Sequence, residues 1–185
     1  MRQPDNDPRV IVLSGASGCG KSTVCQRVVT LAQRRGQTVS GVLTLSRFRA
    51  GRKVGLDVQD IATGAVQPLA EADCPADGPS TGRFHFHAHG IAWGNQLLRG
   101  ITACELLLID ELGPLELLHE QGWVAGLETL RSDVYQRAII VVRPVLVARL
   151  AARLENIAML TVEVTVANRD DLPARILGIK KADGT

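Results

Sequence analysis

Apolar residues in this 185-residue chain form short continuous runs that alternate with segments of helical spacing. Continuous apolar runs are typical of parallel strands that are buried on both faces, and we expect such strands at residues 9–14, 39–45, 105–110, 138–142 and 160–166. The other segments place apolar residues three or four positions apart, which predicts helices at 21–35, 90–98, 121–131, 145–154 and 170–177. The alternation predicts an α/β fold with three layers, in which helices cover both faces of a mostly parallel central sheet.

The pattern after the second strand differs from this alternation. An arginine-rich turn is followed by residues 53–60, where Val54, Leu56 and Val58 share one face of an extended segment. This spacing predicts an antiparallel hairpin beside the parallel sheet. Short further strands are expected at 65–69 and 83–87.

Residues 71–82 are the most loop-like part of the chain, because two prolines, two glycines and three acidic residues fall within twelve positions. No linker-like segment divides the chain, and its length suits a single core. We therefore expect one domain over residues 9–178, with a disordered lead at 1–8 and a flexible tail at 179–185.

Composition narrows the possible environments. No apolar run approaches the length of a membrane span, and the polar N-terminal segment does not resemble a signal peptide. The four cysteines, which are Cys19, Cys25, Cys74 and Cys104, form no C-x-x-C pair. This spacing suggests neither a zinc site nor a disulfide framework, so we expect a cytoplasmic protein without a membrane partner.

The net charge is only +2, which gives no strong signal for nucleic-acid binding. One local basic cluster consists of Arg47, Arg49, Arg52 and Lys53. It fits a solvated hairpin, a DNA contact or a phosphate contact, and the solvated hairpin is the most common of these.

The strongest chemical signal is the run GASGCGKS at residues 15–22, which matches the phosphate-loop pattern G-x-x-x-x-G-K-[ST] at every required position. A predicted strand precedes it and a predicted helix follows, as a working phosphate loop requires. Its glycines allow consecutive backbone N–H groups to point at phosphate oxygens. Lys21 is expected to reach the β- and γ-phosphates as a catalytic residue, and the Ser22 hydroxyl is expected to bind Mg²⁺. The nucleotide-binding residues of the loop are therefore expected to be Gly15, Ala16, Ser17, Gly18, Cys19, Gly20, Lys21 and Ser22.

A second chemical signal is the apolar strand that ends in Asp110 and Glu111. An aspartate at the carboxyl end of a central strand can hold Mg²⁺ opposite Ser22. A carboxylate directly after it can orient or deprotonate water for attack on the γ-phosphate, which is hydrolase chemistry.

Two positions after later strands are further candidates for nucleotide contacts. Arg143 follows the strand at 138–142, where it fits a γ-phosphate sensor, a base contact or a structural ion pair. Asn168 and Arg169 follow the last strand, a place where base-contacting loops often lie.

The run IDELGPLEL at residues 109–117 resembles the D-E-[IL]-G-P-[ML]-E-L signature of a small P-loop family. These are the thermophile-type nucleoside-triphosphatases, whose animal members are called cancer-related nucleoside-triphosphatase. Other marks of the family occur in the same order: GVLT at 41–44 is similar to its G-F-x-T, GRKVGL at 51–56 to its hairpin ending in V-G-F, and NRDD at 168–171 to its final N-R-acidic motif.

The resemblance implies a P-loop NTPase fold and slow, Mg²⁺-dependent hydrolysis of nucleoside triphosphates with loose base preference. By position, it implies that Asp110 binds the metal, Glu111 acts as catalytic base and Glu116 orders the loop or a water. The residues that it implies for phosphate and metal are Gly18, Gly20, Lys21, Ser22 and Thr23. The chain departs from the family at Leu45 and Ser46, where acidic residues are common.

Two other functions fit parts of the pattern. A small-molecule kinase would need an acceptor pocket and an arginine-rich lid, and residues 71–82 are acidic and contain no arginine. A nucleotide-dependent accessory switch of the MobB type would share the phosphate loop and the R-G-x-x-V pattern at 35–39. The acidic signature favours a hydrolase of ATP, GTP or other nucleoside triphosphates, which we expect to be a monomer, and a protein partner stays open.

Overall fold

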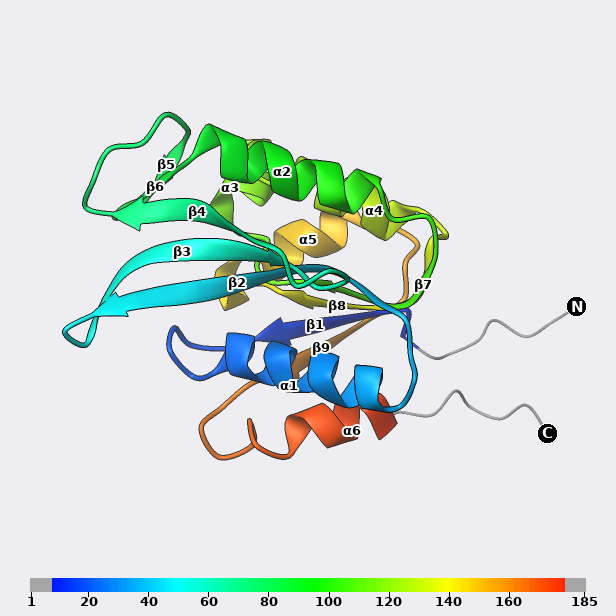
Figure 1. Ribbon diagram of the computed structural model, residues 1–185. Helices are drawn as coiled ribbons and strands as arrows, with labels where there is room; N and C mark the ends of the chain where they lie inside the picture. Colours follow the sequence, from blue (N-terminus) through cyan, green and yellow to red (C-terminus); the bar gives the residue numbers. More distant parts are fainter. Residues whose placement is uncertain (1–7, 179–185) are drawn as a thin grey trace, which may run out of the picture.

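The computed structural model describes residues 8–178, so the predicted tail at 179–185 and all of the predicted lead except Pro8 lie outside the described residues. Within this range the chain forms one nine-stranded sheet with helices on both faces (Figure 1). In chain order the elements are β1 (Val10–Ser14), α1 (Lys21–Arg34), β2 (Val39–Arg49), β3 (Arg52–Asp60), β4 (Val66–Ala72), β5 (Ser80–Thr81), β6 (Phe84–Phe86), α2 (Ala88–Arg99), β7 (Cys104–Ile109), α3 (Pro114–Leu118), α4 (Val124–Arg131), β8 (Tyr135–Val141), the 3₁₀ turn η1 (Pro144–Leu146), α5 (Val147–Arg153), β9 (Met159–Glu163) and α6 (Leu172–Gly178).

The sheet has a parallel part and an antiparallel part that share strand β2. The strand order is β5-β6-β4-β3-β2-β7-β8-β1-β9. Strands β2, β7, β8, β1 and β9 pair in parallel, whereas β2, β3, β4, β6 and β5 pair antiparallel. The predicted mostly parallel sheet and the hairpin are confirmed, and the antiparallel part extends further than a single hairpin.

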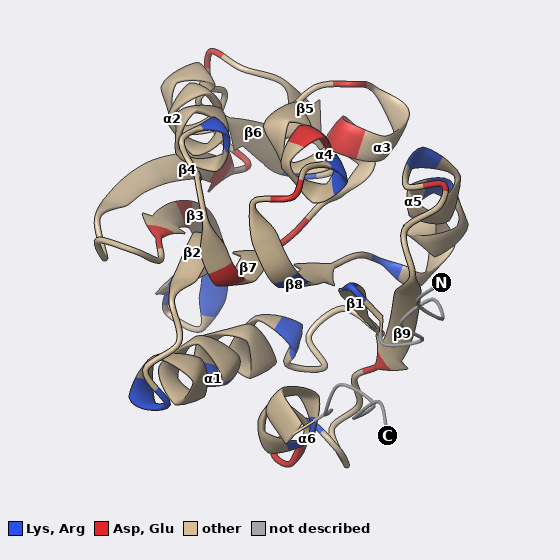
Figure 2. Cartoon of the chain, turned by 90° about the vertical axis from the view of Figure 1, so that its right-hand side faces the viewer, with Lys and Arg blue, Asp and Glu red and all other residues tan. Residues whose placement is uncertain are grey.

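Strand β1 shows how the sequence builds the three layers. Successive side chains of a strand point to opposite faces, so Val10 and Val12 join one core while Ile11 and Leu13 join the other. The first core packs beneath α2, α4 and α5, and the second packs beneath α1 and α6. Figure 2 shows these two helical layers on opposite sides of the sheet. All four side chains are fully buried, which explains the continuous apolar run.

The loop predicted at residues 71–82 is partly wrong. Strand β4 continues to Ala72, and β5 lies inside the predicted loop. Both strands pair with β6, for example Glu71 with His85 and Thr81 with Phe84. Hydrogen bonding to a neighbouring strand therefore overrides the local preference of prolines and glycines for loops.

The helix predicted at 121–131 begins later, at Val124. Gly122 has φ +68°, in the left-handed region, so the helix cannot include it. The periodicity does not predict the short helix α3, which covers the second half of the acidic signature. Among the described residues, no helix has both the length and the apolar character needed to cross a membrane.

Candidate active site

The phosphate loop connects β1 to α1 at the carboxyl edge of the parallel strands. Its glycines Gly15, Gly18 and Gly20 have φ values of +140°, +78° and +106°. A Cβ atom on Gly15 would lie 2.4 Å from the carbonyl oxygen of Val164, and one on Gly20 would lie 2.8 Å from Cδ of Arg169. The loop is thus pressed against the segment that follows β9. Glycine is required at Gly15 for space as well as for backbone conformation, and at Gly18 and Gly20 for backbone conformation.

Lys21 is folded back over this loop. Its Nζ donates hydrogen bonds to the carbonyl oxygens of Gly15 at 2.9 Å and Ala16 at 2.8 Å. The side chain of Cys19 is buried, whereas Ala16, Ser17, Gly18 and Thr23 are exposed. The predicted loop residues therefore lie together at the N-terminus of α1, with the Lys21 ammonium group folded back onto the loop.

Asp110 lies opposite the start of α1, directly after β7. The Ser22 hydroxyl donates a hydrogen bond to Asp110 Oδ1 at 3.3 Å, and Thr44 Oγ1 donates to the Asp110 backbone carbonyl. Asp110 is buried, and its Oδ2 has no hydrogen-bond partner among the described residues. Burial raises the pKa of Asp110 from 3.8 to about 7, although the Ser22 hydrogen bond acts against this rise.

The buried carboxylate and the serine hydroxyl fit a magnesium site. Oxygen atoms of carboxylates and hydroxyls are the ligands that Mg²⁺ prefers, and a cation would satisfy the unpartnered Oδ2 of Asp110. The contact between Ser22 and Asp110 brings together the two sequence signals that lie 88 residues apart.

Glu111 points to the open side of the same edge and forms an ion pair with Arg143. Arg143 Nε donates to Glu111 Oε1 at 2.9 Å, and the side chains are 54% and 31% exposed. Of the roles considered for Arg143, the structure shows the ion pair. Such a half-exposed pair contributes little to stability, on the order of 0–1 kcal/mol, so its main effect is to orient the carboxylate.

Glu116 is a buried carboxylate that holds the loop around α3. Its Oε2 accepts a hydrogen bond from the Gly113 N–H at 2.8 Å, and its Oε1 accepts one from the Trp123 N–H at 2.7 Å. A Cβ atom on Gly122 would lie 2.0 Å from Glu116 Oε1, so only glycine fits there. Burial raises the pKa of Glu116, and the two N–H groups act against that rise.

Lys53 is a site residue that the sequence reasoning missed. It lies on β3 and lines the same pocket as Asp110, Glu111 and Arg143. Burial lowers the pKa of the Lys53 ammonium, and the nearby carboxylates of Glu111 and Asp110 act against this shift. The basic cluster at 47–53 was the sequence feature that could have indicated Lys53. Its members have different surroundings in the structure, because Lys53 lines the pocket whereas Arg47 forms ion pairs with Asp57 and Glu71.

The orientation of Lys53 depends on a β-bulge. Gly55 pairs with Arg47 and Lys53 pairs with Phe48, so Val54 is an extra residue in β3. The bulge reverses the alternation of side chains, and both Lys53 and Leu56 consequently face the pocket. In a regular strand without the bulge, the side chains of Lys53 and Leu56 would lie on opposite faces of the sheet.

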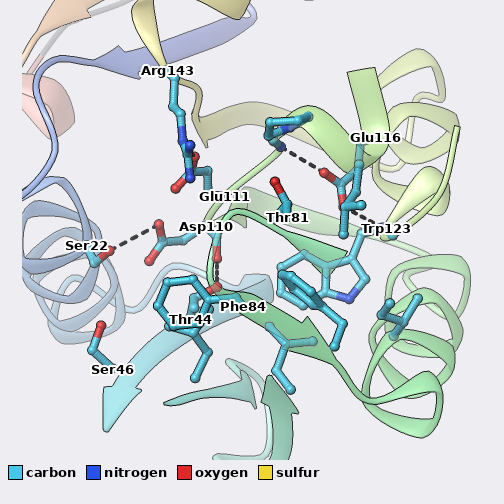
Figure 3. Close-up of a pocket in the computed structure, with 18 of the residues that line it drawn as sticks. Ser22, Thr44, Ser46, Thr81, Phe84, Asp110, Glu111, Glu116, Trp123 and Arg143 are labelled. Atoms are coloured by element: carbon cyan, nitrogen blue, oxygen red, sulfur yellow. Dashed lines mark hydrogen bonds and ion pairs between the residues drawn. The ribbon is translucent and has the colours of Figure 1, made fainter. Parts of the chain in front are cut away.

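The pocket continues beyond the two acidic residues into an apolar region. In Figure 3, Ser22 and Trp123 lie at opposite sides of the pocket, with Asp110 and Glu111 between them. We call this region the apolar pocket. Its walls are Leu56, Leu69, Phe84, Phe86, Ile91, Leu115 and Trp123.

The predicted base-contacting residue Asn168 lies on the other side of the phosphate loop. Its Oδ1 accepts a hydrogen bond from the Thr165 N–H at 2.9 Å, and its Nδ2 donates to the Glu163 carbonyl oxygen at 2.9 Å. The side-chain amide thus stabilises the turn after β9, and the neighbouring Arg169 covers Gly20. A contact between Asn168 and the base stays a prediction.

Comparisons with known proteins agree with this arrangement. A family model described as NTPase matches residues 10–177. The chain is 31% identical over 178 residues to nucleoside-triphosphatase THEP1 of Methanopyrus kandleri, covering 92% of this chain and 94% of that protein. It is 34% identical over 167 residues to nucleoside-triphosphatase THEP1 of Thermofilum pendens, covering 89% and 91%.

Two solved structures are similar in fold. The solution structure of a human cancer-related nucleoside triphosphatase has a TM-score of 0.73 at 22% identity, covering 96% of this chain and all of that chain. The crystal structure of THEP1 from Aquifex aeolicus has a TM-score of 0.69 at 18% identity, covering 92% and 98%. At these identities the two structures support the α/β P-loop fold.

Proposed function

The chain belongs to the NTPase family, and from this premise we propose that it hydrolyses nucleoside triphosphates to diphosphate and phosphate, with Mg²⁺ and with broad tolerance of the base. Its relatives from Methanopyrus kandleri and Thermofilum pendens are named nucleoside-triphosphatases and match nearly the whole chain. The observation that carries the proposal is the Ser22–Asp110 contact, which joins the phosphate loop to the acidic signature with Glu111 beside it.

The residues divide the work of phosphoryl transfer to water. The N–H groups of residues 15–23 and the Lys21 ammonium bind the phosphates. Ser22 and Asp110 would hold Mg²⁺, which supplies positive charge at the β- and γ-phosphate oxygens. Lys53 lines the same pocket and would add a second cation beside the γ-phosphate.

Glu111 supplies the base. The ion pair with Arg143 engages Oε1 and fixes the orientation of the carboxylate, and Oε2 is the atom that accepts the proton of the attacking water. Arg143 lines the same pocket, and its predicted contact with nucleotide stays a prediction. These residues lie at the ends of β1, β7 and β8, apart from Lys53, which lies on β3.

The way in which the turn after β9 is built supports the proposal of broad base tolerance. Asn168 uses its amide oxygen and nitrogen on backbone groups of the turn itself, which leaves little capacity for reading the edge of one particular base. ATP, GTP and other triphosphates would then be bound mainly through their phosphates. We place this activity in a reducing cytoplasm, since the four cysteines are all free thiols.

Phosphate release from ATP, GTP, CTP and UTP with Mg²⁺ tests the proposal in the wild type and in Glu111→Gln. The substitution keeps the size of the side chain and removes the base, so we expect the rate to fall about 10²- to 10⁴-fold while nucleotide binding persists. Glu128→Gln is the matched control, because Glu128 also pairs with an arginine at the surface. A wild type that binds nucleotide without releasing phosphate would refute hydrolysis, and an unaffected Glu111→Gln would refute the base.

A further inference from the structure

The apolar pocket lies on the far side of Glu111 from the phosphate loop. Its walls come from five elements of the antiparallel half and the adjacent helices: Leu56 on β3, Leu69 on β4, Phe84 on β6, Ile91 on α2 and Leu115 on α3. Leu69 and Leu115 are buried, and Leu56 and Ile91 pack against the same core. The pocket is thus a formed part of the fold rather than a gap between mobile loops.

The nucleoside does not need this space. A nucleotide with its phosphates on the loop would place its γ-phosphate beside Asp110 and Glu111, so its nucleoside would extend away from them, toward the turn after β9 whose Arg169 covers Gly20. Strands β3, β4 and β6 lie on the other side of β7 in the sheet. The apolar pocket therefore adjoins the γ-phosphate only, on the side from which an attacking group approaches.

The size of the pocket also exceeds what hydrolysis requires. The whole pocket, from Ser22 to Trp123, has a volume of about 130 Å³. A water molecule needs roughly 10–15 Å³ by the same kind of measure, whereas an engineered apolar cavity of about 150 Å³ in another protein holds benzene. The apolar pocket is only part of this volume, so it admits at most one ring-sized molecule and is too small for a second nucleoside.

The distribution of charge defines the chemistry of that molecule. Asp110, Glu111 and Arg143 lie together at the nucleotide end of the pocket, and Lys53 Nζ lies 5.6 Å from the centroid of the Phe84 ring. The remaining carboxylate, Glu116, is saturated by two backbone N–H groups. An occupant must therefore have an uncharged apolar body among the aromatic and aliphatic walls and must place its polar group beside Glu111.

We propose that the apolar pocket is an acceptor site and that the protein transfers the γ-phosphoryl group to the hydroxyl of a small alcohol or phenol with a ring-sized apolar body. The hydroxyl oxygen forms the new bond to the γ-phosphorus while the bond from the γ-phosphorus to the β–γ bridging oxygen breaks. The hydroxyl proton passes to the Glu111 carboxylate and then to solvent, and the nucleoside diphosphate leaves with the bond electrons. This inference rests on the proposed function, because water and the alcohol would use the same base and the same phosphate site.

The test follows the γ-phosphate of radiolabelled ATP with Mg²⁺ in water alone, with benzyl alcohol and with glycerol at equal concentration. We expect labelled benzyl phosphate in addition to inorganic phosphate, with an ester yield at least about tenfold above that from glycerol, because a buried ring contributes that much to binding. Phosphate release without a benzyl ester above the glycerol level overturns the acceptor site and leaves the hydrolase standing. Ester formation without phosphate release in water alone supports the acceptor site and overturns the hydrolase.

Variants that fill the apolar pocket test whether the alcohol reacts there or elsewhere on the protein. Ile91→Trp and Thr81→Trp introduce a large ring from two different walls, and we expect both to lose ester formation while phosphate release persists. Val66→Trp is the matched control, since Val66 is exposed on β4 outside the pocket, and it should retain both products. Ester formation that is unchanged in both filled variants, with native circular dichroism, overturns the proposal.

Discussion

Replacing Asp110 with asparagine removes a buried charge from the phosphate site without changing the shape of the side chain. In the nucleotide-free protein, Asp110 is buried next to Ser22, and its Oδ2 has no partner among the described residues. Ionisation of this carboxyl therefore costs free energy unless a cation is bound. We expect Asp110→Asn to gain stability relative to the wild type as the pH rises.

The magnitude follows from the shift in the pKa of Asp110. Burial raises it from 3.8 to about 7, so the folded protein keeps a proton that the unfolded chain loses as the pH rises above about 4. The free energy of unfolding of the wild type consequently decreases by roughly 1.4 kcal/mol per pH unit between about pH 4 and about pH 7. Above about pH 7 this contribution no longer changes with pH. The asparagine variant has no such loss, so its advantage should grow by about 3 kcal/mol between pH 5 and pH 8, or roughly 6–12 °C in Tm.

Urea and thermal unfolding without nucleotide and with EDTA, at pH 5 and pH 8, measure this growth. The asparagine amide leaves an N–H group without an acceptor, which adds a constant cost of about 1–3 kcal/mol, so the informative quantity is the change with pH. Asp133→Asn is the control, because the Asp133 side chain is 99% exposed. A difference between Asp110→Asn and wild type that is constant or shrinks from pH 5 to pH 8 would refute the argument from burial.

Three further substitutions test other parts of the site. Glu116→Ala leaves the N–H groups of Gly113 and Trp123 unpaired, so we expect the free energy of unfolding in urea to fall by about 2–4 kcal/mol and kcat to fall as well. An unchanged unfolding midpoint would contradict this role of Glu116. Gly94→Ala would place its Cβ 2.2 Å from Trp123 Nε1 and should cost about 1–3 kcal/mol, and a wild-type Tm would show that the helix shifts freely. Lys53→Met should lower kcat about 10²-fold with little change in nucleotide affinity, and a change in KM alone would assign Lys53 to binding.

The sequence was sufficient to predict the parallel half of the sheet and the loop between β1 and α1. These features depend on local information, because Val10 to Leu13 form a continuous apolar run and the glycines that follow permit the positive φ angles of the loop. The fold and the family resemblance are confirmed by the comparisons. The roles of Glu111 and Asn168 stay predictions, although the structure places Glu111 beside Asp110 at the expected edge.

The features that the sequence did not reveal depend on register between distant strands. Strand β5 exists only because β6 pairs with it, and Lys53 faces the pocket only because Val54 is an extra residue opposite Arg47. The apolar pocket likewise gathers side chains from several elements, and no local pattern marks Leu69 or Ile91 as its walls. A shift of one residue in strand pairing turns a side chain to the opposite face of the sheet. The periodicity of the sequence alone does not reveal such a shift.

The position of β1 in the sheet determines when the protein can first bind nucleotide during its synthesis. Strand β1 lies between β8 and β9, and Gly15 lies against Val164, so the phosphate loop depends on segments that are made long after it. The antiparallel strands pair mostly with their neighbours in sequence and can fold early, whereas the strands around β1 must wait for the C-terminal third of the chain. A ribosome-bound chain from which β9 has not yet emerged therefore contains the complete phosphate-loop motif, but its loop has not reached the folded conformation. Nucleotide binding therefore begins only after β9 has been made, so the ligand stabilises chains that contain β9 and not shorter ones.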